Sequence, residues 1–299
     1  MLEEFTKDSF ISELFFTPFN VWGWAKIPKY SFPSPTDINI NMMPFKVGTD
    51  FKSCKLPGYL EPYWPLISAC IEPQTRRDSW HMWPRGSIPS DIGKVYYLTI
   101  QESWVNKGHS QRRPGLHVDS PGGIKIKGKN PQDSYFKGKG KSQRYLGHHW
   151  GNGCAHYVSH EMSKDIPFCR TLYTMQGGIY MASSVPGSCR VWNCSVKQEA
   201  VGHLGDIEHF RFLLPGEGEV LKPGQLYWIT DRTPHESLPL AKGTYRQFFR
   251  IVTSEVSLWY KDHSTSNPLG VEPDPKITKI VVGDKFCEEG VEIISNDAE

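Results

Sequence analysis

Three residues of this chain have the types and the spacing of a metal site. His117 and Asp119 are separated by one residue, and on an extended strand such residues project from the same face. His235 lies far downstream and can supply a third ligand from a neighbouring strand. Two imidazoles and one carboxylate on one face of a metal leave about three positions open, as in non-haem Fe(II) sites. We therefore expect this set to bind iron and to use dioxygen.

Each of these residues also has a plainer explanation. His117 and Asp119 can cap the turn that Ser120-Pro121-Gly122 predicts. His235, taken alone, can be a loop histidine with an ordinary hydrogen-bond partner. The metal hypothesis therefore depends on the three residues occurring together and in this order.

Two arginines follow His235 in a segment with the composition of a strand. Arg246 comes eleven residues after His235 (246 − 235), and Arg250 comes four further on. The segment 244–252 is rich in aromatic and β-branched residues, so residues 246, 248 and 250 should share one face of a strand. Buried guanidinium groups need anions, and their planar forks bind carboxylates through two hydrogen bonds. The alternatives are a surface ion pair for Arg246 and a structural salt bridge for Arg250.

The ordered set His117-x-Asp119, His235 and Arg246 resembles the Fe(II)/2-oxoglutarate-dependent oxygenases. In that family an HxD motif and a distal histidine bind iron, and a basic residue shortly after the histidine binds the distal carboxylate of the cosubstrate. The Arg246/Arg250 pair is similar to the taurine-dioxygenase-like branch, in which the first arginine holds 2-oxoglutarate. In that branch the second arginine can reach an anionic substrate, so Arg250 is expected to anchor either the substrate or the cosubstrate.

A second and weaker likeness lies in residues 185–190, which are similar to a turn of the phytanoyl-CoA-hydroxylase-like branch. Cys189 stands there in place of the usual histidine. Together the likenesses cover roughly residues 95 to 255. The presence of Asp119 as a carboxylate ligand argues against a halogenase on family grounds.

The resemblance implies cofactors and a reaction. Fe(II), 2-oxoglutarate and O2 are the expected reactants, with ascorbate as a candidate reductant. The expected reaction oxidises an unactivated C–H bond of a small organic substrate, most simply by hydroxylation, and releases succinate and CO2. Desaturation and ring closure use the same core. The alternatives are a hydroxylase or demethylase that acts on a protein or a nucleic acid, and a non-catalytic jelly-roll binding protein.

Other histidines are weaker candidates. His148 and His149 are adjacent, so on a strand they face opposite ways and make a poor joint metal site. A contact with substrate, or a place in a loop near the mouth of the site, is the better expectation for them. His203 and His209 are expected to be solvated.

Two further segments stand out by composition. Residues 123–144 contain many lysines and glycines and only one acidic residue, which predicts a mobile basic loop. This loop is expected to be a solvated lid, and contact with an anionic substrate is the alternative. The aromatic run 80–83 is expected to pack in the core rather than to form a substrate platform.

The elements that must position these residues are short strands separated by Gly and Pro turns, which predict a mainly β protein. The expected fold is a double-stranded β-helix, a jelly-roll or cupin-like core, with flanking helices and an irregular N-terminal arm. We divide the chain into an arm and outer layer packed on the core (1–94), a jelly-roll catalytic core with the inserted basic loop (95–260) and a C-terminal extension (261–299). Short helices are expected near 7–15 and after Pro65. The expected strands are 95–103, the strand that ends at 116–119, 177–185, 189–193, 219–221, 225–230, 236–240 and 244–252.

Composition limits the class of protein. The 299 residues have a formal net charge of +2, a hydrophobic content of 38% and a mean hydropathy of −0.46. These values favour a soluble globular protein and give no general case for binding nucleic acid or membranes. Seven cysteines without CxxC spacing, after an acidic N-terminus that lacks the order of a signal peptide, predict reduced thiols and a cytoplasmic location.

Overall fold

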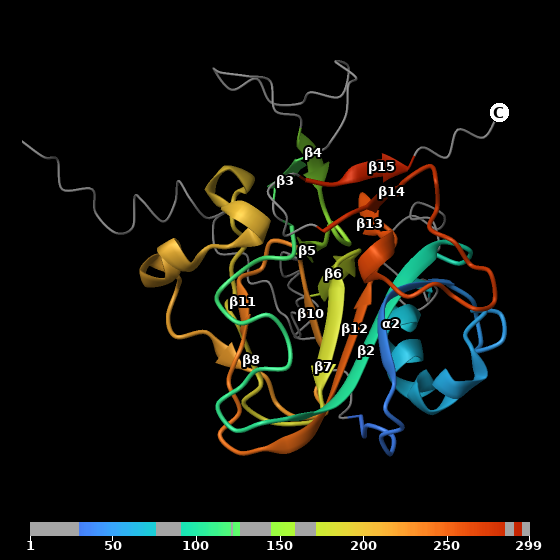
Figure 1. The fold of residues 1–299 in the computed structure, drawn as a ribbon, viewed down its shortest axis with the longest axis horizontal. Coiled ribbons are helices and arrows are strands. Elements are labelled where there is room, and N and C mark those ends of the chain that lie inside the picture. Colours follow the sequence, from blue (N-terminus) through green and yellow to red (C-terminus); the bar gives the residue numbers. More distant parts are fainter. Residues whose placement is uncertain are drawn as a thin grey trace, which may run out of the picture.

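The structure is a computed structural model. Within the residues that it describes, the chain is mainly β, and most neighbouring strands are antiparallel. Figure 1 shows a large central sheet with the helix α2 (Trp64–Thr75) beside it. The predicted mainly β class is therefore confirmed. The described residues are 30–75, 91–120, 122–125, 145–158, 172–284 and 290–294.

Five strands form the main sheet. Their order is β1-β2-β12-β7-β10, and each strand is antiparallel to its neighbours. Strand β12 therefore lies between β2 and β7, with pairing to β2 along its whole length. The strands are β1 (Asn39–Lys46), β2 (Val95–Val105), β7 (Ile179–Ser183), β10 (Tyr227–Ile229) and β12 (Thr244–Val252).

Smaller sheets complete the described part of the fold. One has the order β11-β8-β9, another has the order β13-β14-β15, and two hairpin-like pairs join β3 to β4 and β5 to β6. Strands β13 and β14 are parallel. The strands are β3 (Gly122–Lys125), β4 (Tyr145–His148), β5 (Cys154–Val158), β6 (Leu172–Gln176), β8 (Cys189–Val191), β9 (Glu219–Val220), β11 (His235–Ser237), β13 (Leu258–Tyr260), β14 (Lys279–Val282) and β15 (Glu292–Ile294).

Helical segments are short. The 3-10 turn Gly58–Tyr63 leads directly into α2, which is the one α-helix among the described residues. It begins next to Pro65, where the sequence predicts a helix. Further 3-10 turns occur at Gln198–Ala200, His203–Gly205, Glu208–Leu213 and Lys261–His263.

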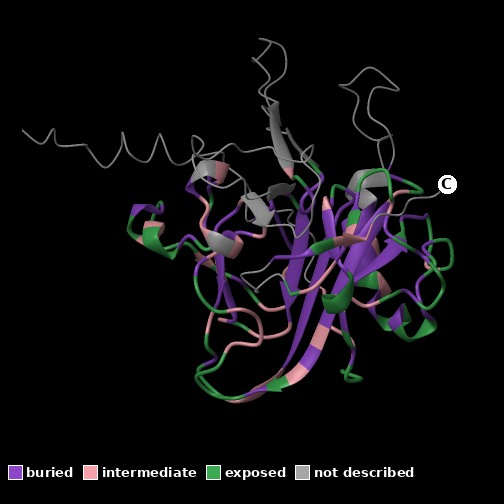
Figure 2. Cartoon of the chain, turned by 45° about the horizontal axis from the view of Figure 1, so that its top comes forward, coloured by how far each residue is buried: buried purple, intermediate pink, exposed green. Residues whose placement is uncertain are grey.

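Alternation along β12 sends its side chains to two faces of the main sheet. Phe249 and Ile251 belong to the apolar core that also contains Ile67 of α2. Phe248 belongs to a second apolar core, and Arg250 has the same parity along the strand as Phe248. Burial of each such apolar side chain stabilises the fold by roughly 1.5–3 kcal/mol. The strand is buried along most of its length, so its polar side chains are also placed in the interior. Figure 2 shows the strands at the centre of the molecule mainly in the colour of buried residues.

The structure corrects two predictions. The expectation of an irregular arm is wrong for residues 39–46, because they form β1 at the edge of the main sheet. A register shift between Ile40 and Met43, with Met42 at a φ of 48°, interrupts the alternation from which the strand could have been recognised. Residues 116–119 do not end a regular strand, since His117 makes only isolated bridges there.

Three segments singled out in the sequence lie outside the described residues: the expected helix near 7–15, the aromatic run 80–83 and residues 126–144 of the basic loop. Strands β3 and β4, which pair with each other, come immediately before and after the last of these. Among the described helices, none combines the length and the apolar character that crossing a membrane requires. The cysteines with described side chains are buried free thiols: Cys54, Cys70, Cys189 and Cys194.

Candidate active site

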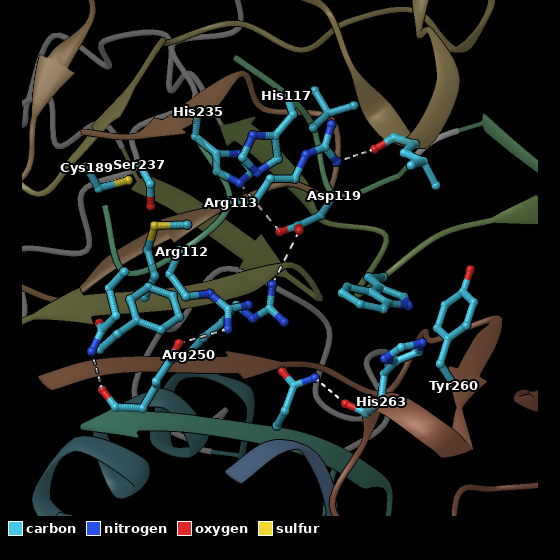
Figure 3. A pocket seen from close by; sticks show the side chains of 18 of the residues that line it. Arg112, Arg113, His117, Asp119, Cys189, His235, Ser237, Arg250, Tyr260 and His263 are labelled. Atoms are coloured by element: carbon cyan, nitrogen blue, oxygen red, sulfur yellow. Dashed lines mark hydrogen bonds and ion pairs between the residues drawn. The ribbon is translucent and has the colours of Figure 1, made fainter. Parts of the chain in front are cut away.

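A cavity of about 360 Å³ lies beside the face of β12 that carries Phe248 and Arg250. This volume is within the range of small-molecule sites. His117, Asp119 and His235 also line the cavity. Figure 3 shows these three side chains converging on one side, with the guanidinium group of Arg250 facing Asp119. The fold therefore brings together residues that are separated by more than one hundred positions in the sequence.

The two histidines are placed by reciprocal backbone hydrogen bonds. The N–H of His117 donates to the carbonyl of His235 at 3.0 Å, and the N–H of His235 donates to the carbonyl of His117 at 2.9 Å. His235 begins β11, which pairs with β8. The two imidazole rings consequently lie with their centroids 4.5 Å apart. The structure therefore places His117 and His235 side by side, as the sequence predicts, although they belong to different segments.

Backbone carbonyls also set the orientation of both imidazoles. The Nδ1 of His117 lies 2.7 Å from the carbonyl of Gly115, and the Nδ1 of His235 lies 2.9 Å from the carbonyl of Thr233. Because a carbonyl only accepts, Nδ1 carries a proton in each ring, and Nε2 is the nitrogen that faces away from this contact. Burial, together with the nearby His235, lowers the pKa of His117 to about 3. The His117 imidazole is therefore neutral at neutral pH, as a metal ligand must be.

Asp119 makes contacts in two directions. Its Oδ2 lies 3.8 Å from the Nε2 of His235, and its Oδ1 lies 3.3 Å from the Nη1 of Arg250. The three expected ligands line one cavity, but within the described residues no three His, Cys, Asp or Glu side chains are gathered closely enough to form a finished metal centre. The donor set still fits Fe(II), since it consists of two imidazole nitrogens and a carboxylate oxygen.

Arg246 is completely buried, and it does not line the cavity itself. Its Nε donates to the hydroxyl of Ser183 at 3.1 Å. Its two terminal nitrogens have no hydrogen-bond partner among the described residues. Burial lowers the pKa of Arg246 to about 10, and the side chain interacts electrostatically with Cys189, which does line the cavity. Arg246 is thus a buried cation, held at one nitrogen, behind the inner wall of the cavity.

Arg250 reaches further into the cavity than Arg246. Its guanidinium carbon lies 5.2 Å from the centre of the Trp150 ring, which is a cation–π arrangement, and one terminal nitrogen pairs with Asp119. The predicted shared face of residues 246, 248 and 250 is consistent with these positions. The structural salt bridge weighed for Arg250 is present, and its partner is the expected carboxylate ligand.

The two adjacent histidines behave differently, as alternation predicts. His148 is buried and lines the cavity, whereas His149 is exposed and lies outside the lining. The His148 ring lies 5.3 Å from Trp150 and 5.9 Å from Tyr260, measured between ring centroids. These three rings form an aromatic wall of the cavity. His209 also lies outside the lining, with its ring on Phe210.

A close approach of two glycines positions this wall. The N–H of Gly178 donates to the carbonyl of Gly151 at 2.7 Å, and Gly151 has a φ of 81°. A Cβ atom on Gly151 would lie 2.3 Å from the carbonyl oxygen of Gly178. Only glycine therefore allows the backbone after Trp150 to turn against the main sheet.

Sequence reasoning missed several residues of this region. Arg112 and Arg113 line the cavity just before the His117-x-Asp119 pair, and their position next to the motif was the available signal. Trp150 and Tyr260 had no signal, because their place in the wall depends on the tertiary fold.

A second missed feature is a clamp outside the cavity. Arg211 donates to Glu208 and to Glu236, with contacts of 2.9 Å and 2.6 Å from its Nη2. Glu208 in turn accepts a hydrogen bond from the N–H of Leu116 at 3.0 Å. Since Leu116 precedes His117 and Glu236 follows His235, the clamp joins the two segments that carry the histidines.

Comparisons with protein-family models, with curated proteins and with solved structures found no match for this chain. The functional proposal is therefore supported by the side chains of the cavity and by the sequence motif. Two oriented imidazoles, a carboxylate and buried arginines lie within or directly behind one cavity of small-molecule size.

Proposed function

We propose that this protein is an Fe(II)- and 2-oxoglutarate-dependent dioxygenase that oxidises a C–H bond of a small organic substrate. The observation that supports this most strongly is the meeting of His117 and His235 with Asp119 in one cavity. Both imidazoles have Nδ1 hydrogen-bonded to a backbone carbonyl, which leaves both Nε2 atoms available for a metal.

The three residues would hold the metal, and other residues would support them. His117, Asp119 and His235 are the proposed ligands of Fe(II). Iron and 2-oxoglutarate, when bound, supply the oxidation of a C–H bond by O2 with release of succinate and CO2. The reciprocal backbone hydrogen bonds fix the separation of the two histidines. Arg250 holds Asp119 through its Oδ1.

Arg246 is the proposed anchor of the distal carboxylate of 2-oxoglutarate. Both of its terminal nitrogens are buried without a hydrogen-bond partner among the described residues, and two such N–H groups match a carboxylate in bidentate geometry. The Ser183 hydroxyl holds the remaining nitrogen, Nε, at 3.1 Å. A carboxylate would therefore satisfy donors that otherwise cost free energy to bury.

The fold and the cavity support two further parts of the proposal. We infer that the main sheet and the β11-β8-β9 sheet are the two faces of a double-stranded β-helix, which would place β11 and β12 around a common site. The cavity volume of about 360 Å³ favours a small molecule over a protein or nucleic-acid substrate. The four buried free thiols are compatible with the reducing environment of the cytoplasm.

Metal binding and product formation test this function. Purified protein is titrated with Fe(II) under argon and then assayed for succinate from 2-oxoglutarate with ascorbate and O2. We expect one Fe(II) per chain and succinate formation, and loss of both in His235→Ala. His109→Ala is the matched control, because His109 is exposed and lies outside the cavity. Unchanged iron binding in His235→Ala, or no iron binding by the wild type, would overturn the proposal.

A further inference from the structure

Arg112 is a cavity side chain for which the proposed iron and cosubstrate chemistry has no use. It lines the cavity, and its Nη1 donates to the neutral amide oxygen of Gln101 at 3.2 Å. Asp119 acts on Arg112 through its charge, but the salt bridge of Asp119 within the cavity is with Arg250. A partly buried guanidinium whose hydrogen-bond partner is a neutral amide gains from an anion that a ligand supplies.

The segment that carries Arg112 is firmly attached to the main sheet. The side-chain Nε2 of Gln111 donates to the hydroxyl of Ser103 at 2.8 Å, to the carbonyl of Arg246 at 3.1 Å and to the carbonyl of Gln101 at 3.2 Å. This amide therefore joins the segment before the metal motif to both β2 and β12. Arg112 is consequently held in place rather than free to swing into solvent.

Arg112 and the proposed cosubstrate anchor both lie against the ring of Phe248. The guanidinium carbon of Arg112 lies 5.1 Å from the centre of the Phe248 ring, and that of Arg246 lies 5.4 Å from the same ring. Arg112 lines the cavity, whereas Arg246 does not. An anion within the cavity is therefore in reach of Arg112.

The balance of charge around the cavity supports the same conclusion. Arg112, Arg113 and Arg250 line the cavity, and Asp119 is the acidic side chain of its lining. Arg113 is held by the carbonyl of Leu204 at 2.6 Å, which is a neutral partner. Burial, together with the nearby Arg250, lowers the pKa of Arg112 to about 9. The described lining therefore has an excess of positive charge next to Arg112.

The remaining wall of the cavity is suited to a carbon skeleton. Trp150 and Tyr260 lie edge to face, with ring centroids 6.5 Å apart, and both line the cavity together with Met181. Aromatic and thioether side chains offer dispersion contacts to a flat or aliphatic body. The cavity thus combines a cationic end with an apolar wall.

We propose that Arg112 is a specificity-determining residue that binds the anionic group of an organic acid substrate, whose carbon body contacts Trp150 and Tyr260. The anionic group is a carboxylate, sulfonate or phosphate, since each accepts hydrogen bonds from a guanidinium fork. This inference rests on the proposed function for its reaction, while the anion site itself depends only on Arg112 and its surroundings. It differs from the role that the family likeness gives to Arg250, because Arg250 is already paired with Asp119.

Matched acids and neutral analogues test the inference. The probes are benzoate, phenylacetate, 3-phenylpropionate, phenylmethanesulfonate and phenyl phosphate, each compared with its neutral amide or ester. Binding to the full chain is measured by calorimetry under argon, first without additions and then with Fe(II) and 2-oxoglutarate present. We expect at least one acid to bind about tenfold or more tightly than its neutral analogue, because charge-assisted hydrogen bonds are worth that much. The acid that is preferred identifies which anionic group the site takes.

Three variants locate the anion. Arg112→Gln should lose the preference for the acid, and Arg112→Lys should recover part of it. Arg232→Gln is the matched control, because Arg232 also donates to a glutamine amide, that of Gln198 at 3.2 Å, but lies outside the cavity. Thermal melting of each variant verifies that it folds. If Arg112→Gln does not fold, the recovery of binding in Arg112→Lys is compared with the wild type directly.

The outcomes separate this inference from the proposed function. Equal binding of acids and neutral analogues by the wild type would overturn the inference, and so would an acid preference that Arg112→Gln retains. If Arg112→Gln loses 2-oxoglutarate binding but keeps the acid preference, Arg112 belongs to the cosubstrate site, and the inference is also overturned. Loss of the acid preference in Arg112→Gln would support the inference even if the wild type failed to bind Fe(II), which would count only against the dioxygenase.

Discussion

The Nη1 of Arg250 lies 3.3 Å from the Oδ1 of Asp119, so a β12 arginine is the ion-pair partner of the expected carboxylate ligand. The two side chains are largely buried, with exposures of 6% and 10%. A buried carboxylate keeps its charge only with a cation nearby. Arg250 therefore contributes to the site by pairing with Asp119 and orienting its carboxylate.

This relationship predicts the behaviour of Arg250→Gln. Removing one partner of a buried ion pair costs about 3–5 kcal/mol, so we expect the free energy of unfolding to fall by about 3 kcal/mol in metal-free buffer. Addition of Mn²⁺ should reduce the deficit, because the metal supplies the positive charge that Asp119 has lost. Urea denaturation with and without Mn²⁺ measures both effects.

Arg190→Gln is the control for that experiment. Arg190 lies 3.7 Å from Glu236 but is 33% exposed, so its loss should cost no more than about 1 kcal/mol and should not respond to Mn²⁺. Wild-type stability in Arg250→Gln, or a deficit that Mn²⁺ leaves unchanged, would contradict the role given to the Arg250–Asp119 pair.

The Arg211 clamp predicts an effect on metal binding from outside the cavity. Arg211→Ala would break the link between Glu208, which holds the segment before His117, and Glu236 of β11. We expect metal affinity to fall by roughly tenfold to hundredfold, as for other residues that support metal ligands. The effect on global stability should be about 1 kcal/mol, because the Arg211 side chain is 38% exposed.

Calorimetric titration with Mn²⁺ measures this affinity, and Lys94→Gln serves as the control. Lys94 is in a similar exposed pair, with Asp91 at 2.6 Å, away from the cavity. If Arg211→Ala and Lys94→Gln bind Mn²⁺ equally well, the clamp has no positioning role.

Asp231 predicts a specific pH dependence of stability. It is 4% exposed, and burial raises its pKa from the ordinary 3.8 to about 6. Because the folded state binds the proton more tightly than the unfolded state, this residue's contribution to stability is fully present below the unfolded pKa and is lost as the pH rises through about 6. The loss is on the order of 3 kcal/mol for a shift of about two units.

Asp231→Asn removes that titration and keeps an oxygen that can accept the backbone N–H of Trp150. We expect the variant to match the wild type near pH 4 and to exceed it in stability above pH 6. Denaturation curves across this range give the difference between the two proteins. A difference that does not change with pH would show that Asp231 is not protonated over this range in the folded state.

The proposed role of Arg246 predicts that its substitution weakens the binding of 2-oxoglutarate but not the binding of iron. Arg246→Gln should bind 2-oxoglutarate roughly tenfold to hundredfold more weakly, since a hydrogen bond to a charged group is worth about 1.5–3 kcal/mol. Iron affinity should change little, because Arg246 does not line the cavity with the three proposed ligands. Titration of 2-oxoglutarate into the Fe(II) protein measures the effect, and the same loss in Arg250→Gln but not in Arg246→Gln would reverse the assignment of the two arginines.

Much of the β framework could be predicted from the sequence, because its strands have clear composition and turns. Strand β12 occupies the predicted residues 244–252, and the alternation along it correctly placed residues 246, 248 and 250 on one side. Strand β1 could not be recognised, because a register shift with Met42 in a left-handed conformation breaks its alternation. The bridges of His117 are likewise tertiary pairings that leave no periodic pattern in residues 116–119.

For the site, the motif indicated which side chains meet but not their surroundings. The pairing of Asp119 with Arg250 depends on the packing of β12 against the segment before β3. Similarly, the aromatic wall depends on the close approach of Gly151 and Gly178. Arg112 is separated from His117 by only four residues, yet its place in the cavity and its neutral partner, Gln101, are set by three-dimensional contacts.

The central claim is that His117, Asp119 and His235 bind Fe(II) to which 2-oxoglutarate then chelates. Its most direct test is the visible absorption spectrum of the protein under argon as Fe(II) and then 2-oxoglutarate are added. The account predicts a charge-transfer band that requires both additions, is absent from His235→Ala and needs more 2-oxoglutarate in Arg246→Gln. Absence of the band from folded wild-type protein at saturating Fe(II) and 2-oxoglutarate, or its full retention in His235→Ala, would contradict the account.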